Sequence, residues 1–236
     1  MSERYFSDRD PVEGRIRLMS DEAHHLARVA RKMVGDRITI LNGRGTSYVA
    51  EILSVQADGV VARVIEETHE AGEWSLPLVL GVAIPKGDRA DWLVEKAVEV
   101  GVTCLVPLRT ERSVVDPRGS KLDRFRKRVV EASKQAGRSR LMEITEPEAV
   151  VPWFHEASDE ARFIGLPGTR SPAGRVSVAR SRSIRLAIGP EGGFSSGEVH
   201  QAQEAGWIPV GLGPAILRVE TAAIVGCASL AQALNP

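Results

Sequence analysis

Two strand-to-loop-to-helix units lie in tandem within residues 183–223, and they constrain the fold more than any other feature of the chain. In the first, the apolar run 184–188 leads into Gly189-Pro190-Glu191-Gly192-Gly193-Phe194, and the capping-box sequence 195–198 predicts the start of a helix. In the second, residues 207–212 lead through a further glycine-containing loop into an apolar helix expected from Thr221 to Leu234. Such units are typical of α/β folds, in which ligands bind beyond the carboxyl ends of the strands.

The sequence before these units also alternates between strand and helix patterns. Apolar runs predict strands at 76–84, 102–108, 142–145 and 162–166, and helical patterns cover 88–100 and 121–136. The strand at 162–166 runs into Leu166-Pro167-Gly168-Thr169, a third loop of the same kind. This alternation predicts a mostly parallel sheet covered by helices.

The first 70 residues follow a different pattern. A helix is expected from Ser20 to Met33, and alternating runs predict strands at 14–19, 37–41, 47–55 and 60–66. Residues 68–75 are polar and without periodicity, as in a linker. The sequence therefore predicts a small β-rich domain over residues 1–72 and an α/β domain over residues 73–236.

Composition limits the classes of protein. Basic and acidic residues number 31 each among 236 residues, so net charge favours neither nucleic acid nor any other partner. Nine basic residues against two acidic ones between Arg118 and Arg140 give that segment a local charge of 9 − 2 = +7. No apolar run reaches the roughly 18 residues of a membrane span. The opening Met1-Ser2-Glu3-Arg4 has no signal-peptide pattern, so we expect a cytoplasmic protein without a membrane contact. Cys104 and Cys227 lack ligand spacing, and no metal site is expected.

Two strings, GPEGGFSSGE and LGPAILRVETA, resemble the paired signature of the ribosomal RNA small subunit methyltransferase E family in the SPOUT class. The resemblance extends through KGDRADWLVEKAVEVGV, PLRTERSVV and VEASKQAGRSR, and covers nearly the whole chain. It implies a C-terminal SPOUT α/β domain with a deep trefoil knot, preceded by a PUA-like β-barrel that binds RNA. It also implies a homodimer.

The resemblance further implies methyl transfer from S-adenosylmethionine to N3 of one uridine in 16S ribosomal RNA of the small ribosomal subunit. The three loops would then hold the cofactor. The residues expected to bind it are Leu166, Gly168, Gly189, Pro190, Glu191, Gly193, Leu212, Gly213, Ile216 and Leu217.

Methylation at N3 has a specific chemical demand, because the nitrogen is a poor nucleophile while it carries a proton. Arg218 is the candidate for stabilising the negative charge that develops on the uracil. Glu191 or Glu220 would accept the proton or orient Arg218, and a first-turn carboxylate without a chemical role is an equal alternative for Glu220. Arg4, Lys86, Arg112 and Arg138 are candidates for RNA contact, although Arg4 could equally dock the N-terminus.

Two other functions are alternatives to this interpretation. A nucleotide-dependent oxidoreductase is disfavoured because the loop from Gly211 to Ile216 lacks a third glycine and contains Pro214. An RNA-binding ribosome-assembly module without catalysis would need only the basic segment. Binding of S-adenosylmethionine, of a nicotinamide dinucleotide or of neither separates the three functions.

Overall fold

The computed structural model describes residues 3–56, 59–156, 160–173 and 181–232, and the chain divides into two compact units. Unit 1 comprises Met1–Glu73 with Val130–Leu141, and unit 2 comprises Trp74–Val129 with Met142–Pro236. The sequence placed 130–141 in the second domain, whereas this segment packs with unit 1. The reason lies in contacts that join residues distant in sequence, such as the hydrogen bonds from Arg4 to the carbonyls of Lys134 and Gln135.

The described residues of unit 1 form a five-stranded sheet of order β1-β3-β4-β5-β2. Its strands are β1 (Arg4–Phe6), β2 (Arg15–Leu18), β3 (Arg37–Leu41), β4 (Thr46–Gln56) and β5 (Gly59–His69). All neighbours are antiparallel except β1 and β3. The sequence predicted the four later strands, and it missed β1 because three residues are too short to show a period.

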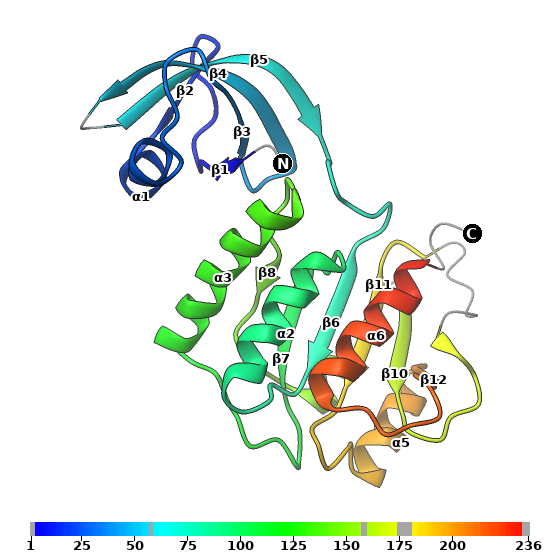
Figure 1. Cartoon of the computed structure of the whole chain (residues 1–236). Coiled ribbons are helices and arrows are strands. Elements are labelled where there is room, and N and C mark those ends of the chain that lie inside the picture. The colour runs from blue at the N-terminus through cyan, green and yellow to red at the C-terminus, as the bar shows by residue number, and fades with distance from the viewer. Residues whose placement is uncertain (1–2, 57–58, 157–159, 174–180, 233–236) are drawn as a thin grey trace. The chain divides into compact units, whose positions relative to one another are not determined.

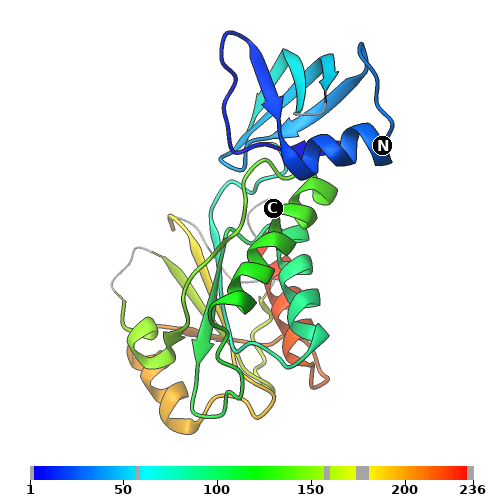
Figure 2. The same cartoon turned by 90° about the vertical axis from the view of Figure 1, so that its left-hand side faces the viewer.

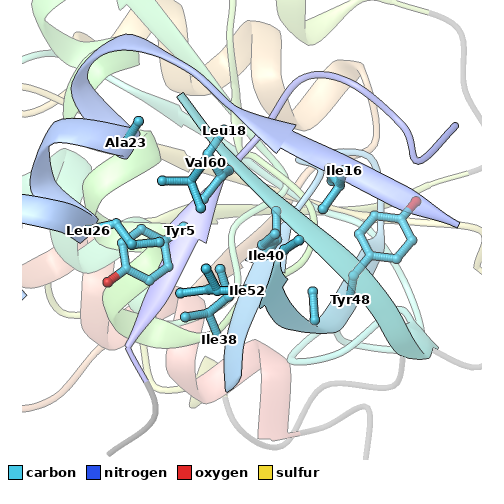
Figure 3. Close-up of a cluster of buried hydrophobic side chains, with 12 residues drawn as sticks. Tyr5, Ile16, Leu18, Ala23, Leu26, Ile38, Ile40, Tyr48, Ile52 and Val60 are labelled. Carbon is cyan, nitrogen blue, oxygen red and sulfur yellow. The ribbon is translucent and has the colours of Figure 1, made fainter. Parts of the chain in front are cut away.

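The helix of unit 1 is shorter than its sequence predicts. It comprises α1 (Ser20–His24) and a π-helical turn, η1 (His25–Val29), instead of running to Met33. Arg31 has a φ of +51°, a left-handed conformation that a right-handed helix cannot contain. The helical segment contributes Leu26 to the core, where it lies with Tyr5 from β1 and aliphatic side chains from the sheet (Figure 3).

The described residues of unit 2 form a sheet of seven strands in which every pair is parallel. The strand order is β12-β10-β11-β6-β7-β8, and β9 pairs with β7. The strands are β6 (Leu78–Val82), β7 (Cys104–Arg109), β8 (Glu143–Ile144), β9 (Glu148–Ala149), β10 (Ala161–Gly165), β11 (Ile184–Ile188) and β12 (Ile208–Val210). The predicted parallel sheet is confirmed. In the sheet, β7 and β8 lie on one side of β6, and β11, β10 and β12 lie on its other side. The order in which the chain adds strands therefore changes direction at β6.

Helices cover both faces of this sheet (Figures 1 and 2). Helices α2 (Asp88–Glu99) and α6 (Val219–Gln232) lie on one face with the beginning of α3 (Ser120–Ala136). The short α4 (Val150–Phe154) and α5 (Ser196–Glu204) lie on the other. The predicted end of the last helix, Leu234, lies outside the described residues. Among the helices of the described ranges, none has both the length and the apolar character needed to cross a membrane.

Each face has its own core. On the α4 and α5 face, Trp153, Phe154, Phe194 and Trp207 form a cluster of rings, with Trp153 and Trp207 centroids 4.9 Å apart. On the other face, α6 approaches the sheet at Gly226, where a Cβ would meet Leu186 of β11 at 2.7 Å. This close packing holds the middle of α6 against the middle of β11.

Candidate active site

Three loops at the carboxyl ends of β10, β11 and β12 surround one cavity of about 290 Å³ in unit 2. Its lining comes from Gly165 to Pro167, from Ile188 to Phe194 and from Leu212 to Ala222. The loops that lead into α2, α5 and α6 lie at the same, lower end of the sheet in Figure 1. The parallel register of the strands therefore brings together segments that are far apart in sequence.

The loop after β11 is held by a network around Glu198. Its carboxylate accepts hydrogen bonds from the amide of Ser195 at 2.8 Å and from the amide of Glu111 at 2.7 Å. The predicted capping box is present, with the Ser195 hydroxyl accepting from the Glu198 amide at 3.3 Å. Arg112 donates to the carbonyl of Gly192 at 2.7 Å. The loop after β7 therefore fixes the loop after β11.

Backbone hydrogen bonds join the loop after β10 to the loop after β12. The amide of Gly211 donates to the carbonyl of Ser171 at 2.7 Å, and the amide of Ala173 donates to the carbonyl of Gly211 at 3.2 Å. The space beside Gly211 is filled by the carbonyl of Thr169, which any Cβ would strike. Only glycine fits this approach, so the glycine determines the distance between the two loops.

The loop after β12 lines the cavity and contains backbone N–H groups without an acceptor among the described residues. Within the part of the chain that the structure describes, the amides of Leu212, Gly213, Ile216 and Leu217 donate to no protein acceptor. The surrounding side chains, including Ile188, are mostly apolar. A ligand with flat apolar rings and hydrogen-bond acceptors at their edges matches such a surface.

A charged cluster lies at the edge of the cavity, and its central residue is Arg89 of α2. Its Nη2 lies 3.1 Å from Oε1 of Glu191, and its Nη1 lies 3.7 Å from Oε2 of Glu220. One guanidinium thus connects two carboxylates carried by different loops. Sequence reasoning missed Arg89, although it lies inside the quoted string KGDRADWLVEKAVEVGV.

Arg218 lines the cavity but takes no part in that cluster. Among the described residues, no carboxylate lies within ion-pair distance of its guanidinium. The side chain is exposed, so its charge is available to a bound molecule.

The structure places nine of the ten residues expected to bind a cofactor in the cavity lining. Gly168 is the exception. Its φ of +78° forms the turn in which the Thr169 amide donates to the Leu166 carbonyl at 3.4 Å. The predicted catalytic candidates Glu191 and Arg218 also line the cavity, and Glu220 lines a neighbouring one.

The four candidates for RNA contact separate into two kinds. Lys86 and Arg112 of unit 2 are exposed. In unit 1, Arg138 is instead buried, with its side chain 2% exposed and a 2.6 Å contact to Glu73, whose side chain is 5% exposed. Arg4 donates to the carbonyls of Lys134 and Gln135 at the end of α3, so it docks the N-terminal strand. The predicted RNA contact at Arg138 is therefore wrong. Its guanidinium is buried and pairs with Glu73, because an unpaired buried charge would be costly.

Across the described residues, no group of three or more His, Cys, Asp or Glu side chains could hold a metal ion. Cys104 and Cys227 are free thiols, and burial raises the pKa of both, to about 12 for Cys104.

Comparisons with known proteins agree with this geometry. The RNA methyltransferase domain family matches residues 72–231, and the RNA methyltransferase PUA domain family matches residues 20–65. The ribosomal RNA small subunit methyltransferase E of Synechocystis is 32% identical over 224 residues, covering 93% of this chain and 73% of that protein.

The chain belongs to the ribosomal RNA small subunit methyltransferase E family. The member from Bacillus subtilis is 28% identical over 225 residues, which cover 90% of this chain and 88% of that one. A family member from Neisseria gonorrhoeae, solved bound to S-adenosyl methionine, superposes with a TM-score of 0.89 at 27% identity and 98% coverage of both chains. Unit 2 accordingly has the SPOUT fold of this family, and unit 1 is its PUA-like domain.

Proposed function

We propose that this protein methylates N3 of a uridine in 16S ribosomal RNA, with S-adenosylmethionine as the methyl donor. The observation that carries the proposal is the convergence of three loops on one cavity with Arg218 and Glu191 at its edge. The Neisseria relative bound to S-adenosyl methionine supports the choice of donor.

The cavity residues fit such a cofactor. The apolar walls at Ile188 and Leu212 suit the faces of an adenine ring, and the free amides of Gly213, Ile216 and Leu217 suit its nitrogen atoms and the ribose oxygens. When bound, S-adenosylmethionine supplies an electrophilic methyl group on a positively charged sulfur.

The chain's own task is to turn uracil N3 into a nucleophile. Arg218 stabilises negative charge on a uracil carbonyl oxygen, since its guanidinium is exposed at the cavity and free of carboxylate partners among the described residues. In this proposal a carboxylate accepts the N3 proton, and Glu191 and Glu220 are the candidates near the cavity. Arg89 holds both of them, so their positions depend on one another.

We further propose that the target is uridine 1498 in the common numbering of 16S ribosomal RNA, within the assembled small subunit. The protein acts as a homodimer in the cytoplasm, where ribosomal subunits are assembled. Lys86 and Arg112, exposed on unit 2, contact phosphates of the RNA.

Mass mapping of modified nucleosides in small-subunit RNA from cells that lack this protein tests the target. Loss of one N3-methyluridine, restored by the wild-type gene, is the expected result. Persistence of every N3-methyluridine would show that the substrate assignment is wrong.

Calorimetric titration of the purified protein separates this function from its alternatives. An enzyme of the proposed kind binds S-adenosylmethionine or its demethylated product. A binding module without catalysis binds neither, and an oxidoreductase binds a nicotinamide dinucleotide instead.

A further inference from the structure

A second and wider cavity of about 720 Å³ adjoins the first in unit 2. The residues Ile216, Leu217 and Arg218 line both cavities. The opposite wall of the second cavity comes from Arg89 and Trp92 of α2 and from the first turn of α6. A molecule bound there would lie next to a cofactor in the first cavity, with only one short segment between them.

The wall of this second cavity includes an exposed aromatic ring. Trp92 is 43% exposed, whereas Trp153 and Trp207 are buried and Trp74 is half-buried. Ile216, which also lines the cavity, is 89% exposed. A flat ring beside an aliphatic side chain is a surface on which a nucleobase stacks, and stacking on aromatic rings is how proteins hold unpaired bases.

Glu220 supplies an acceptor in the same cavity. Its side chain is 9% exposed, and its one ion-pair contact among the described residues is the 3.7 Å approach to Arg89. Neither carboxylate oxygen accepts a hydrogen bond from the described residues, and Oε2 is buried without one. A buried carboxylate without a donor is unfavourable, and a ligand with an N–H group would supply the missing bond.

The pattern of donors and acceptors matches one base. The Watson–Crick edge of uracil presents a carbonyl oxygen, the N3–H group and a second carbonyl oxygen, in that order. The cavity offers the acceptor Glu220 together with two donors, Arg89 and Arg218. Cytosine has a bare nitrogen at N3, which a carboxylate would repel. The charge pattern therefore selects uracil.

We propose that this second cavity receives the unstacked uracil base, with Trp92 as its stacking surface and Glu220 as the acceptor of the N3 proton. The inference rests on the proposed function and adds to it the site of the substrate base. The N3 proton passes to the Glu220 carboxylate. The electron pair left on N3 forms the new bond to the methyl carbon, and the electrons of the broken carbon–sulfur bond stay on sulfur. Arg218 stabilises the carbonyl oxygen during this exchange.

Trp92 is tested by substitution, with Val114→Ala as the control, because Val114 is an exposed apolar residue of unit 2 outside both cavities. Trp92→Ala should raise the KM for small subunits about tenfold or more, as expected for loss of one stacked base. Trp92→Phe should recover most of the loss, and calorimetric affinity for S-adenosylmethionine should be unchanged in all three variants. Equal KM values for Trp92→Ala and wild type would overturn the assignment.

Fluorescence provides a readout that needs no turnover. An RNA oligonucleotide with one unpaired uridine should protect Trp92 from acrylamide quenching, and the same oligonucleotide with cytidine or 3-methyluridine at that position should protect it less. Equal protection by all three would overturn the edge recognition. If Trp92→Ala instead converts a dimer into monomers, as measured by analytical ultracentrifugation, this surface is a contact between two copies of the chain and the assignment is overturned.

Glu220→Gln tests the proton acceptor, because the amide keeps the shape of the side chain but cannot take the proton. Its turnover should fall at least about a hundredfold. RNA containing 5-fluorouridine, whose N3–H is more acidic, should restore turnover of the variant far more than that of wild type. Equal effects of the fluorine on both proteins would exclude Glu220 as the acceptor. Wild-type protein that methylates no uridine would instead refute the proposed function itself.

Discussion

The guanidinium of Arg89 lies 3.1 Å from the carboxylate of Glu191, and this contact joins helix α2 to the loop that follows β11. The same side chain reaches Glu220 at the start of α6. Arg89, from a distant part of the chain, thus positions two of the three candidate catalytic residues, Glu191 and Glu220. The cluster forms because the carboxyl ends of β6, β11 and β12 lie at one edge of a parallel sheet.

Arg89→Ala should lower kcat about 10- to 100-fold, because both carboxylates lose the group that positions them. Affinity for S-adenosylmethionine should change much less, and Arg89→Lys should recover only part of the activity, since an ammonium cannot hold two carboxylates in a fork. Arg124→Ala is the matched control, because Arg124 of α3 pairs at 3.0 Å with Asp91 of α2, the helix that also carries Arg89. Steady-state kinetics with small subunits distinguishes the effects, and equal losses in both variants would contradict a specific role for Arg89.

Arg218→Ala should abolish turnover and leave cofactor affinity nearly intact, because the guanidinium is expected to act on the charge of the uracil and not on the cofactor. Calorimetry and a methyl-transfer assay on the same preparation check both quantities. A parallel loss of affinity would reassign Arg218 to cofactor binding.

Gly211→Ala should weaken S-adenosylmethionine binding about tenfold or more, because the new Cβ would strike the carbonyl of Thr169 and separate two cofactor loops. Gly197→Ala is the control, since its Cβ would meet nothing closer than the Ser195 hydroxyl at 3.9 Å. Calorimetric titration of both variants measures the difference. Unchanged affinity in Gly211→Ala would show that the loops adjust freely.

Arg138→Ala should destabilise the protein by about 3–5 kcal/mol, because it leaves Glu73 buried and without its charge partner. Arg140→Ala removes the exposed pair with Glu70 and should cost at most about 1 kcal/mol. Urea unfolding followed by fluorescence gives both free energies. Similar small losses in the two variants would contradict a structural role for Arg138.

Neither cysteine should react with a thiol reagent at pH 8 in the folded protein. Burial, and then repulsion from Glu143 and Glu148, raises the pKa of Cys104 to about 12, and burial alone raises that of Cys227. Relative to an unfolded thiol with a pKa of about 8.5, the thiolate fraction of Cys104 falls roughly a thousandfold. Both thiols should react once denaturant is added. Rapid labelling without denaturant would show that the strand or helix opens readily.

Local patterns in the sequence predicted much of the fold. The apolar runs predicted the parallel strands of the described residues except β9, whose two residues are too few to show a pattern. The capping-box sequence at Ser195 and Glu198 predicted the start of α5, and the reciprocal hydrogen bonds confirm it. The helix after Ser20 was predicted too long, because periodicity could not reveal the left-handed conformation at Arg31. The glycine-containing loops after strands, together with the family resemblance, also identified most of the cavity lining.

The candidate site was less accessible to sequence reasoning. In the sequence, Arg89 and Trp92 have the pattern of ordinary helix residues. They become candidate site residues only because they line the second cavity together with Arg218. Arg138 sits in a basic segment that suggests a phosphate surface, yet its partner Glu73 lies far away in the chain. Opposite charges in sequence do not reveal which pairs will be buried together.

By itself, the sequence determined the alternation of strands and helices, the positions of the three loops and the residue types available in them. These properties follow from interactions between residues a few positions apart, which periodicity and turn preferences report directly. The tertiary structure alone decided which charges meet and which are buried, and which two cavities share the segment before α6. Those outcomes depend on strand order and close packing, through contacts between residues that are distant in the chain.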